Sequence, residues 1–196
     1  MDAALRRATE ADIPDLARLF IMAADGIVDA VYHDLVPGLA LEKIFEWRFN
    51  QVGTVLSYEC CWVAQDGLQI AGMVNAYPID HLADAPSDPR LTADRLAVFR
   101  PFETLREQAA GSYYINLVAV YPEWRGKGIG HRLIGLATSD AQQQGLTELS
   151  LIVFEQNSRA VALYRRLGFE ISARSQVAPH RLIRRTGDLV LMKRRL

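Results

Sequence analysis

The chain has 196 residues, 50% of them hydrophobic, and its 22 Lys and Arg oppose 23 Asp and Glu to leave a formal net charge of −1. At roughly 150 residues per domain, this length suits one domain with a sizeable apolar core, which excludes intrinsic disorder as the main state. The balanced charge gives no electrostatic basis for nucleic-acid binding. No apolar run approaches the ~20 residues that span a bilayer, so no membrane contact is expected. The start of the chain lacks the apolar stretch of a secretory signal, and we therefore expect a cytoplasmic protein.

The first part of the chain predicts a strand followed by helices. Residues 3–8 suit a short strand, and Thr9 with Asp12 three residues later forms a capping-box pattern. Apolar residues from Ile13 onward recur at helical spacing, which predicts a helix directly after this cap. Residues 41–51 predict a second helix, and we expect the two helices to lie side by side.

Residues 58–64 and 69–77 are rich in β-forming residues and flank the turn dipeptide Asp66-Gly67, which predicts a hairpin. The following stretch, residues 79–111, is polar and interrupted by prolines. We interpret it as a long insertion between strands, in which residues 101–109 can form a helix that starts at its proline.

The second part of the chain alternates strand and helix. The expected elements are a strand over 113–120, a helix over 129–144, a strand over 149–154, a helix that follows Asn157 and ends before Gly168, and strands near 169–177 and 189–194. The helical crossover makes the strands over 113–120 and 149–154 parallel. The fold class is therefore mixed α/β, as one domain over residues 1–196.

Glycines alternate at positions 126, 128 and 130, between a strand and a helix. Glycine lets the backbone approach an anion closely, and the N-terminus of a helix is electrically positive. Arg125 and Lys127 add positive charge, so the segment predicts a phosphate-binding turn. Two common nucleotide patterns do not fit, because Gly128 stands where a P-loop needs Ser or Thr and the glycine spacing is not G-x-G-x-x-G.

The pattern R-x-x-G-x-G over residues 125–130 resembles that of the GNAT superfamily of acetyl-CoA-dependent N-acetyltransferases. The pattern N-x-x-A-x-x-L-Y-x-x-L-G-F over residues 157–169 is similar to the second CoA-binding segment of that family, so the resemblance covers residues 113–169. It implies a mixed, mainly antiparallel sheet with splayed parallel strands, flanked by helices. It also implies direct transfer of an acetyl group from acetyl-CoA to a primary amine of a small molecule or peptide, without a metal.

The resemblance also implies roles for individual residues. Pantetheine would pair with the strand ending at Val120, and the pyrophosphate would rest on the amides of the glycine turn. The implied cofactor-binding residues are Val118, Ala119, Val120, Arg125, Gly126, Lys127, Gly128, Ile129, Gly130, His131, Asn157 and Tyr164. The amide of Val118 would polarise the thioester carbonyl, and Tyr164 would protonate the departing CoA thiolate. Taken without the motif, Tyr164 is a core tyrosine, Asn157 an N-cap and His131 a solvent-facing side chain.

The general base is not marked by a motif. Members of the family often place a carboxylate on the strand that here covers residues 113–117, and this strand has none. Tyr114 and Asn116 share a face and could hold a water that relays the proton, while Glu59 on the preceding hairpin is a remote carboxylate. The alternative is that all three are strand residues bordering a cleft. The histidines are too scattered to form a metal site, and we expect none.

Two other functions share the same motifs. One is a non-catalytic module that binds acyl-CoA as a sensor or scaffold, and the other is a transferase of acyl groups longer than acetyl. The resemblance implies that the acceptor is chosen by the helices near residues 13–51 and by the connection over 79–111, which are idiosyncratic in this chain. The sequence leaves open whether the chain forms a homodimer.

Overall fold

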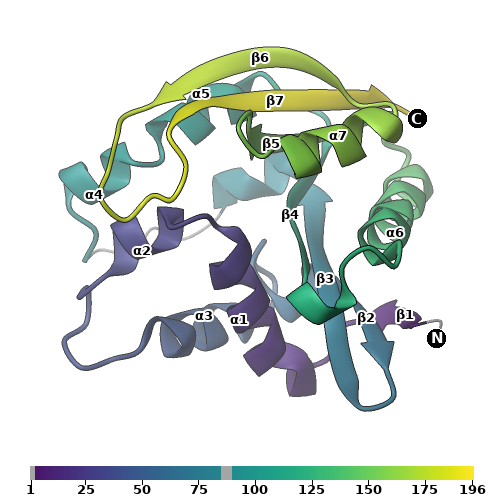
Figure 1. Ribbon diagram of the computed structural model, residues 1–196, viewed down its shortest axis with the longest axis horizontal. Helices are drawn as coiled ribbons and strands as arrows, with labels where there is room; N and C mark the ends of the chain where they lie inside the picture. The colour runs from purple at the N-terminus through teal and green to yellow at the C-terminus, as the bar shows by residue number, and fades with distance from the viewer. Residues whose placement is uncertain (1–2, 85–89) are drawn as a thin grey trace.

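A seven-stranded sheet runs through the protein in the order β1-β2-β3-β4-β5-β7-β6 (Figure 1). The computed structural model describes residues 3–84 and 90–196. The strands are β1 (Ala4–Arg7), β2 (Cys61–Asp66), β3 (Gln69–Pro78), β4 (Tyr113–Val120), β5 (Glu148–Phe154), β6 (Glu170–Val177) and β7 (Gly187–Arg195). Within these ranges each neighbouring pair is antiparallel except β4 and β5. The mixed, mainly antiparallel sheet is therefore confirmed.

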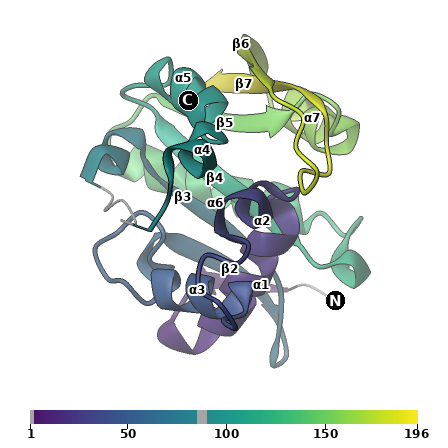
Figure 2. The same ribbon diagram turned by 90° about the vertical axis from the view of Figure 1, so that its left-hand side faces the viewer.

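Helices cover both faces of the sheet (Figures 1 and 2). They are α1 (Ile13–Ala23), α2 (Ile27–Tyr32), α3 (Leu41–Phe49), α4 (Ala93–Ala97), α5 (Arg100–Glu107), α6 (Ile129–Gln143) and α7 (Ser158–Arg166). Val74 packs with α6 and its neighbour Met73 with α1, so these helices lie on opposite faces of β3. The predicted contact of α1 with α3 is confirmed, and α5 packs against β6 and β7. No helix in the described ranges is long and apolar enough to cross a membrane.

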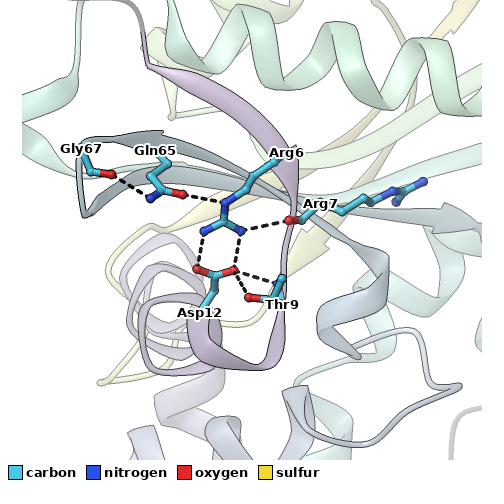
Figure 3. Close-up of polar contacts among 6 residues, drawn as sticks. All are labelled: Arg6, Arg7, Thr9, Asp12, Gln65 and Gly67. Carbon is cyan, nitrogen blue, oxygen red and sulfur yellow. Dashed lines mark hydrogen bonds and ion pairs between the residues drawn. The ribbon is translucent and has the colours of Figure 1, made fainter.

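One carboxylate holds the turn between β1 and α1 (Figure 3). Asp12 accepts hydrogen bonds from Thr9 N at 2.8 Å and from Thr9 Oγ1 at 3.0 Å, and Arg6 donates to its two oxygens at 2.7 and 2.8 Å. Arg6 Nε also donates to Gln65 Oε1 on β2 at 2.6 Å. Burial raises the pKa of Asp12, but the hydrogen bonds from Arg6 and Thr9 outweigh it and leave that pKa below its ordinary value. The predicted capping box is confirmed, with a 3₁₀ turn over Glu10–Asp12 before α1.

The predicted hairpin is confirmed as β2 and β3, with Gly67 at a φ of 57° in the turn. Its first strand begins later than residue 58, because Tyr58–Cys60 form a 3₁₀ turn. Ser57 caps this turn, since its Oγ accepts from Glu59 N at 3.2 Å. The placement of Glu59 on a strand was therefore wrong, and it lies in a turn before the sheet.

The sheet opens between β4 and β5. These strands pair only over residues 113–115 and 149–151, while the remainder of β4 stays on β3 and the remainder of β5 stays on β7. A bulge at Asn116, which has no opposite residue on β3, marks the point where β4 leaves β5. The splayed parallel strands implied by the family resemblance are thus confirmed.

The connection between β3 and β4 contains more helix than predicted. The helix expected over 101–109 is confirmed as α5, with Pro101 in its first turn, and the short α4 precedes it. Residues 85–89 of this connection lie outside the described residues. The helix α2 was also missed, because its six residues span fewer than two turns and include three β-branched side chains.

Candidate active site

A cavity of about 810 Å³ lies at the opening between β4 and β5. The strands β4 and β5 contribute residues 115–120 and 151–154 to its walls. The rest comes from the turn after β4 with the start of α6, from α1, α2, α5 and α7, and from the β6–β7 connection with β7. A volume of this size is typical of sites that hold a cofactor or small substrate. The opening of the sheet therefore creates the space for a ligand.

The edge of β4 presents unpaired backbone groups to this cavity. Tyr121 N donates to Ala71 O on β3 at 3.0 Å. Since alternate residues of a strand face the same edge, Ala119 also points its backbone toward β3, whereas Val118 and Val120 point theirs into the opening. Arg125 Nε donates to Val120 O at 3.0 Å, which agrees with this direction. The amides of Val118 and Val120 and the carbonyl of Val118 are thus available to a ligand.

The turn after β4 leaves further amides open. Gly126 and Gly128 have φ values of 78° and 77°, a conformation that favours glycine. Within the described chain no amide between Arg125 and Arg132 donates to a protein acceptor, and Arg132 N is the first to do so, to Gly128 O at 3.1 Å. These open amides lie at the positive N-terminal end of α6. The turn is therefore suited to bind a phosphate group.

Two side chains of the α7 segment reach the same cavity. Asn157 Oδ1 accepts from Ala160 N at 3.3 Å, which confirms it as the N-cap of α7. Tyr164 is 9% exposed, and its ring lies against Phe169 with centroids 5.9 Å apart. Burial, with a smaller effect of Tyr114, raises the pKa of Tyr164 to about 12. Its hydroxyl therefore keeps its proton at neutral pH and is available as a donor to a group in the cavity.

A sequence model of the Acetyltransferase (GNAT) family matches residues 29–169. The chain belongs to the GNAT acetyltransferase family. It is 29% identical over 172 residues to an enzyme of Pseudomonas paraeruginosa named L-methionine sulfoximine/L-methionine sulfone acetyltransferase, a match that covers 88% of this chain and 83% of that relative. The GNAT resemblance predicted from the two motifs is confirmed, and the protein is an acyltransferase.

Solved structures agree with the GNAT fold. An N-acetyltransferase from Staphylococcus aureus Mu50 superimposes with a TM-score of 0.67 at 20% identity, covering 97% of this chain and 100% of that chain. A Salmonella typhimurium structure, described with its cofactor acetyl-CoA, gives a TM-score of 0.60 at 19% identity, covering 100% of this chain and 95% of that chain. At these identities the likeness establishes the fold alone.

The walls of the cavity between β4 and β5 contain most of the residues that the motifs indicated for the cofactor. Lys127 stays outside its walls, with its Nζ 4.3 Å from the centroid of the Trp124 ring. Ala119 lines the cavity, although its backbone faces β3. The other predicted cofactor residues in the walls are Val118, Val120, Arg125, Gly126, Gly128, Ile129, Gly130, His131, Asn157 and Tyr164.

Only one of the three side chains considered for proton transfer reaches the cavity. Asn116 lines it and donates from Nδ2 to Asn75 Oδ1 at 2.9 Å. Tyr114 is 1% exposed and lies in the adjoining core, outside the walls. Glu59 also lies outside them, and its Oε2 accepts from Gly53 N at 3.1 Å within its own loop. The structure thus separates Asn116 from Tyr114 and Glu59.

The cavity also holds charged residues that the sequence did not indicate. Asp25 is the one acidic residue among the described walls, and its Oδ2 accepts from Arg185 Nε at 2.7 Å. Arg184 N donates to Asp25 O at 2.8 Å, so the β6–β7 connection contacts the turn that precedes α2. Arg106 reaches the walls from α5. Among the described residues no group of three or more His, Cys, Asp or Glu could hold a metal.

Proposed function

We propose that the protein transfers an acetyl group from acetyl-CoA directly to a primary amine of a small molecule or peptide, as one transferase domain over residues 1–196. The single observation that carries this proposal is the opening of the sheet, where β4 presents free backbone groups beside a turn of free amides. A strand edge of this kind pairs with an amide-bearing chain, and the amide turn binds phosphate. CoA has both parts in one molecule.

The proposal assigns CoA to the residues that line the cavity. The pyrophosphate rests on the amides of Gly126–His131, and two of the arginines of α7, Arg159 and Arg166, line the same cavity and add positive charge. Pantetheine amides pair with Val118 C=O and Val120 N–H, which leaves Val118 N–H free for the thioester, while Val120 O is already engaged by Arg125. This arrangement directs the thioester toward the centre of the opening.

The reaction follows from this placement. The amine nitrogen attacks the thioester carbon, and the Val118 amide donates a hydrogen bond to the oxyanion that forms. The C–S bond then breaks while the new C–N bond remains, and the Tyr164 hydroxyl donates its proton to the CoA thiolate. The amine gives its surplus proton to water held at Asn116. Tyr164 then recovers a proton from the water that accepted one from the amine, so atoms and charges balance without a metal or a covalent enzyme intermediate.

Release of CoA from acetyl-CoA, measured with a panel of amines, tests the proposal. The panel includes L-methionine sulfone and L-methionine sulfoximine, since these name the activity of the Pseudomonas relative. A non-catalytic acyl-CoA-binding module would bind CoA but release none with any amine. A transferase of longer acyl groups would turn over butyryl-CoA or longer donors faster than acetyl-CoA.

A further inference from the structure

Arg106 lines the cavity at the end away from the glycine turn. Its guanidinium carbon lies 5.6 Å from the ring centroid of Tyr114, near the start of β4, and 5.8 Å from that of Phe102. Val118 follows Tyr114 by ~13 Å along the strand, and the glycine turn follows the end of β4. The proposed thioester position therefore lies between Arg106 and the phosphate site, so Arg106 lies on the side of the thioester that CoA leaves open.

This guanidinium has no anionic partner in the described protein. Its Nε is buried without a hydrogen-bond partner, its side-chain hydrogen bond is with the uncharged hydroxyl of Tyr114, and no described carboxylate lies within ion-pair distance of it. Glu103, on the same helix, attracts Arg106 electrostatically but is itself exposed to solvent. An arginine stays charged in proteins, and a partly buried charge without an anionic partner is costly. A ligand anion would remove that cost.

The neighbouring charged residues indicate the charge that this anion carries. Asp25 and Arg185, which line the same cavity, neutralise each other through their 2.7 Å ion pair. Arg106 therefore leaves one uncompensated positive charge, and the planar fork of its N–H donors matches the two oxygens of a carboxylate. Phe99 and Phe102 line the wall beside it and suit the apolar part of a small molecule.

We propose that Arg106 binds a carboxylate of the acceptor, so that the acceptor is an amine that also carries a carboxylate group, as free amino acids do. This inference rests on the proposed acetyl transfer and specifies its substrate class. It makes Arg106 a specificity-determining residue that contacts the acceptor and takes no part in bond making.

The first test compares matched acceptors on the unaltered protein. CoA release is measured with α- and ω-amino acids and with the corresponding amides, which keep the amine but lose the carboxylate charge. Since the amine of an amide is less basic, kcat/KM is calculated for the unprotonated amine in each case. We expect at least one amino acid to exceed its amide about ten- to hundredfold, the range for a hydrogen-bonded charged pair. Equal values or a preference for the amides in every pair would overturn the inference.

The second test removes the charge. Arg106→Met keeps an unbranched apolar side chain, and Arg106→Lys keeps the positive charge without the fork. We expect Arg106→Met to lower the kcat/KM of the acids more than that of the amides and so to lose the preference for acids, with Arg106→Lys intermediate. Arg100→Met is the matched control, because Arg100 is an exposed arginine of the same helix, and it should keep the preference.

A binding measurement separates this inference from the proposed function. N-acetyl amino acids and their amides, which are the reaction products, are titrated into the protein saturated with CoA. Tighter binding of the acids that is lost in Arg106→Met supports the carboxylate site, even if no amine in the panel is acetylated and the transfer proposal fails. If acids and amides bind alike while amines are acetylated, the transfer stands and the role of Arg106 is refuted.

Discussion

Replacement of Tyr164 by Phe isolates the proposed proton donor from the packing of its ring. The aromatic contact with Phe169 is preserved, and no hydrogen bond between the hydroxyl and the described residues is lost, so the free energy of unfolding should change by less than about 1 kcal/mol. The thiolate, however, would leave without a proton donor. General acid catalysis is typically worth about 10² to 10⁴ in rate, which corresponds to about 2.7–5.4 kcal/mol of transition-state stabilisation.

The assay measures kcat from CoA release and CoA affinity from the thermal shift, on the same preparation. We expect kcat of Tyr164→Phe to fall at least a hundredfold, with CoA affinity unchanged. Tyr113→Phe is the matched control: Tyr113 lies in the same core cluster but outside the cavity, and its hydroxyl donates to Asp140 at 2.5 Å. That variant should lose about 1–3 kcal/mol of stability and keep its kcat. A kcat of Tyr164→Phe close to that of the unaltered protein would refute the proton-donor role.

Two further predictions concern the phosphate turn and the β1–α1 turn. A Cβ at Gly128 or at Gly145 meets no atom within 4 Å, and both residues have a left-handed φ, so Gly128→Val and Gly145→Val should lose similar stability through backbone strain. CoA at a hundred times its Kd should stabilise the unaltered protein by about 2.7 kcal/mol, which is seen as a rise in its unfolding temperature. Only Gly128→Val should lose this rise. An equal rise in both variants would exclude Gly126–His131 as the phosphate site. Because the pKa of Asp12 is lowered on folding, its ionised form adds stability above its unfolded pKa of about 4, and this is lost as the pH falls further. Asp12→Asn should therefore cost about 1–2 kcal/mol at pH 7 and progressively less as the pH is lowered from about 4 through the folded-state pKa of Asp12, as measured by urea unfolding.

The elements next to the glycine turn were predictable because their signals are local. The strand over Tyr113–Val120, the turn glycines and the Asn157 cap are each specified by residues close together in the chain, and the structure contains all of them. Glu59 was misplaced because a serine cap, which sets a 3₁₀ turn, resembles the start of a strand in a sequence rich in β-formers.

The charged side of the cavity could not be predicted, since its residues meet only after folding. Asp25 and Arg185 come from opposite ends of the chain and join through one ion pair. Arg106 stands on an amphipathic helix where an arginine is ordinarily solvated, and only the packing of α5 on β6 and β7 brings it into the cavity. Spacing along the sequence carries no information on such contacts.

The path of the amine proton leads to a prediction about pH. Asn116 cannot accept a proton as a base, Glu59 lies outside the cavity, and Asp25 is paired with Arg185. If water at Asn116 takes the proton, kcat/KM should rise with pH along the ionisation of the acceptor amine, and the apparent pKa should move when a less basic amine is used. A carboxylate base would instead give the same apparent pKa with every amine.

Glu59→Gln and Asp25→Asn complete this test. Glu59→Gln keeps an oxygen that can accept from Gly53 N, so its rate should change less than about threefold, whereas loss of a true base costs about 10² or more. Asp25→Asn weakens the ion pair with Arg185, and we expect a raised KM with little change in the shape of the pH profile. A large fall in kcat with CoA affinity intact, in either variant, would make that carboxylate the base and overturn the transfer of the proton to water.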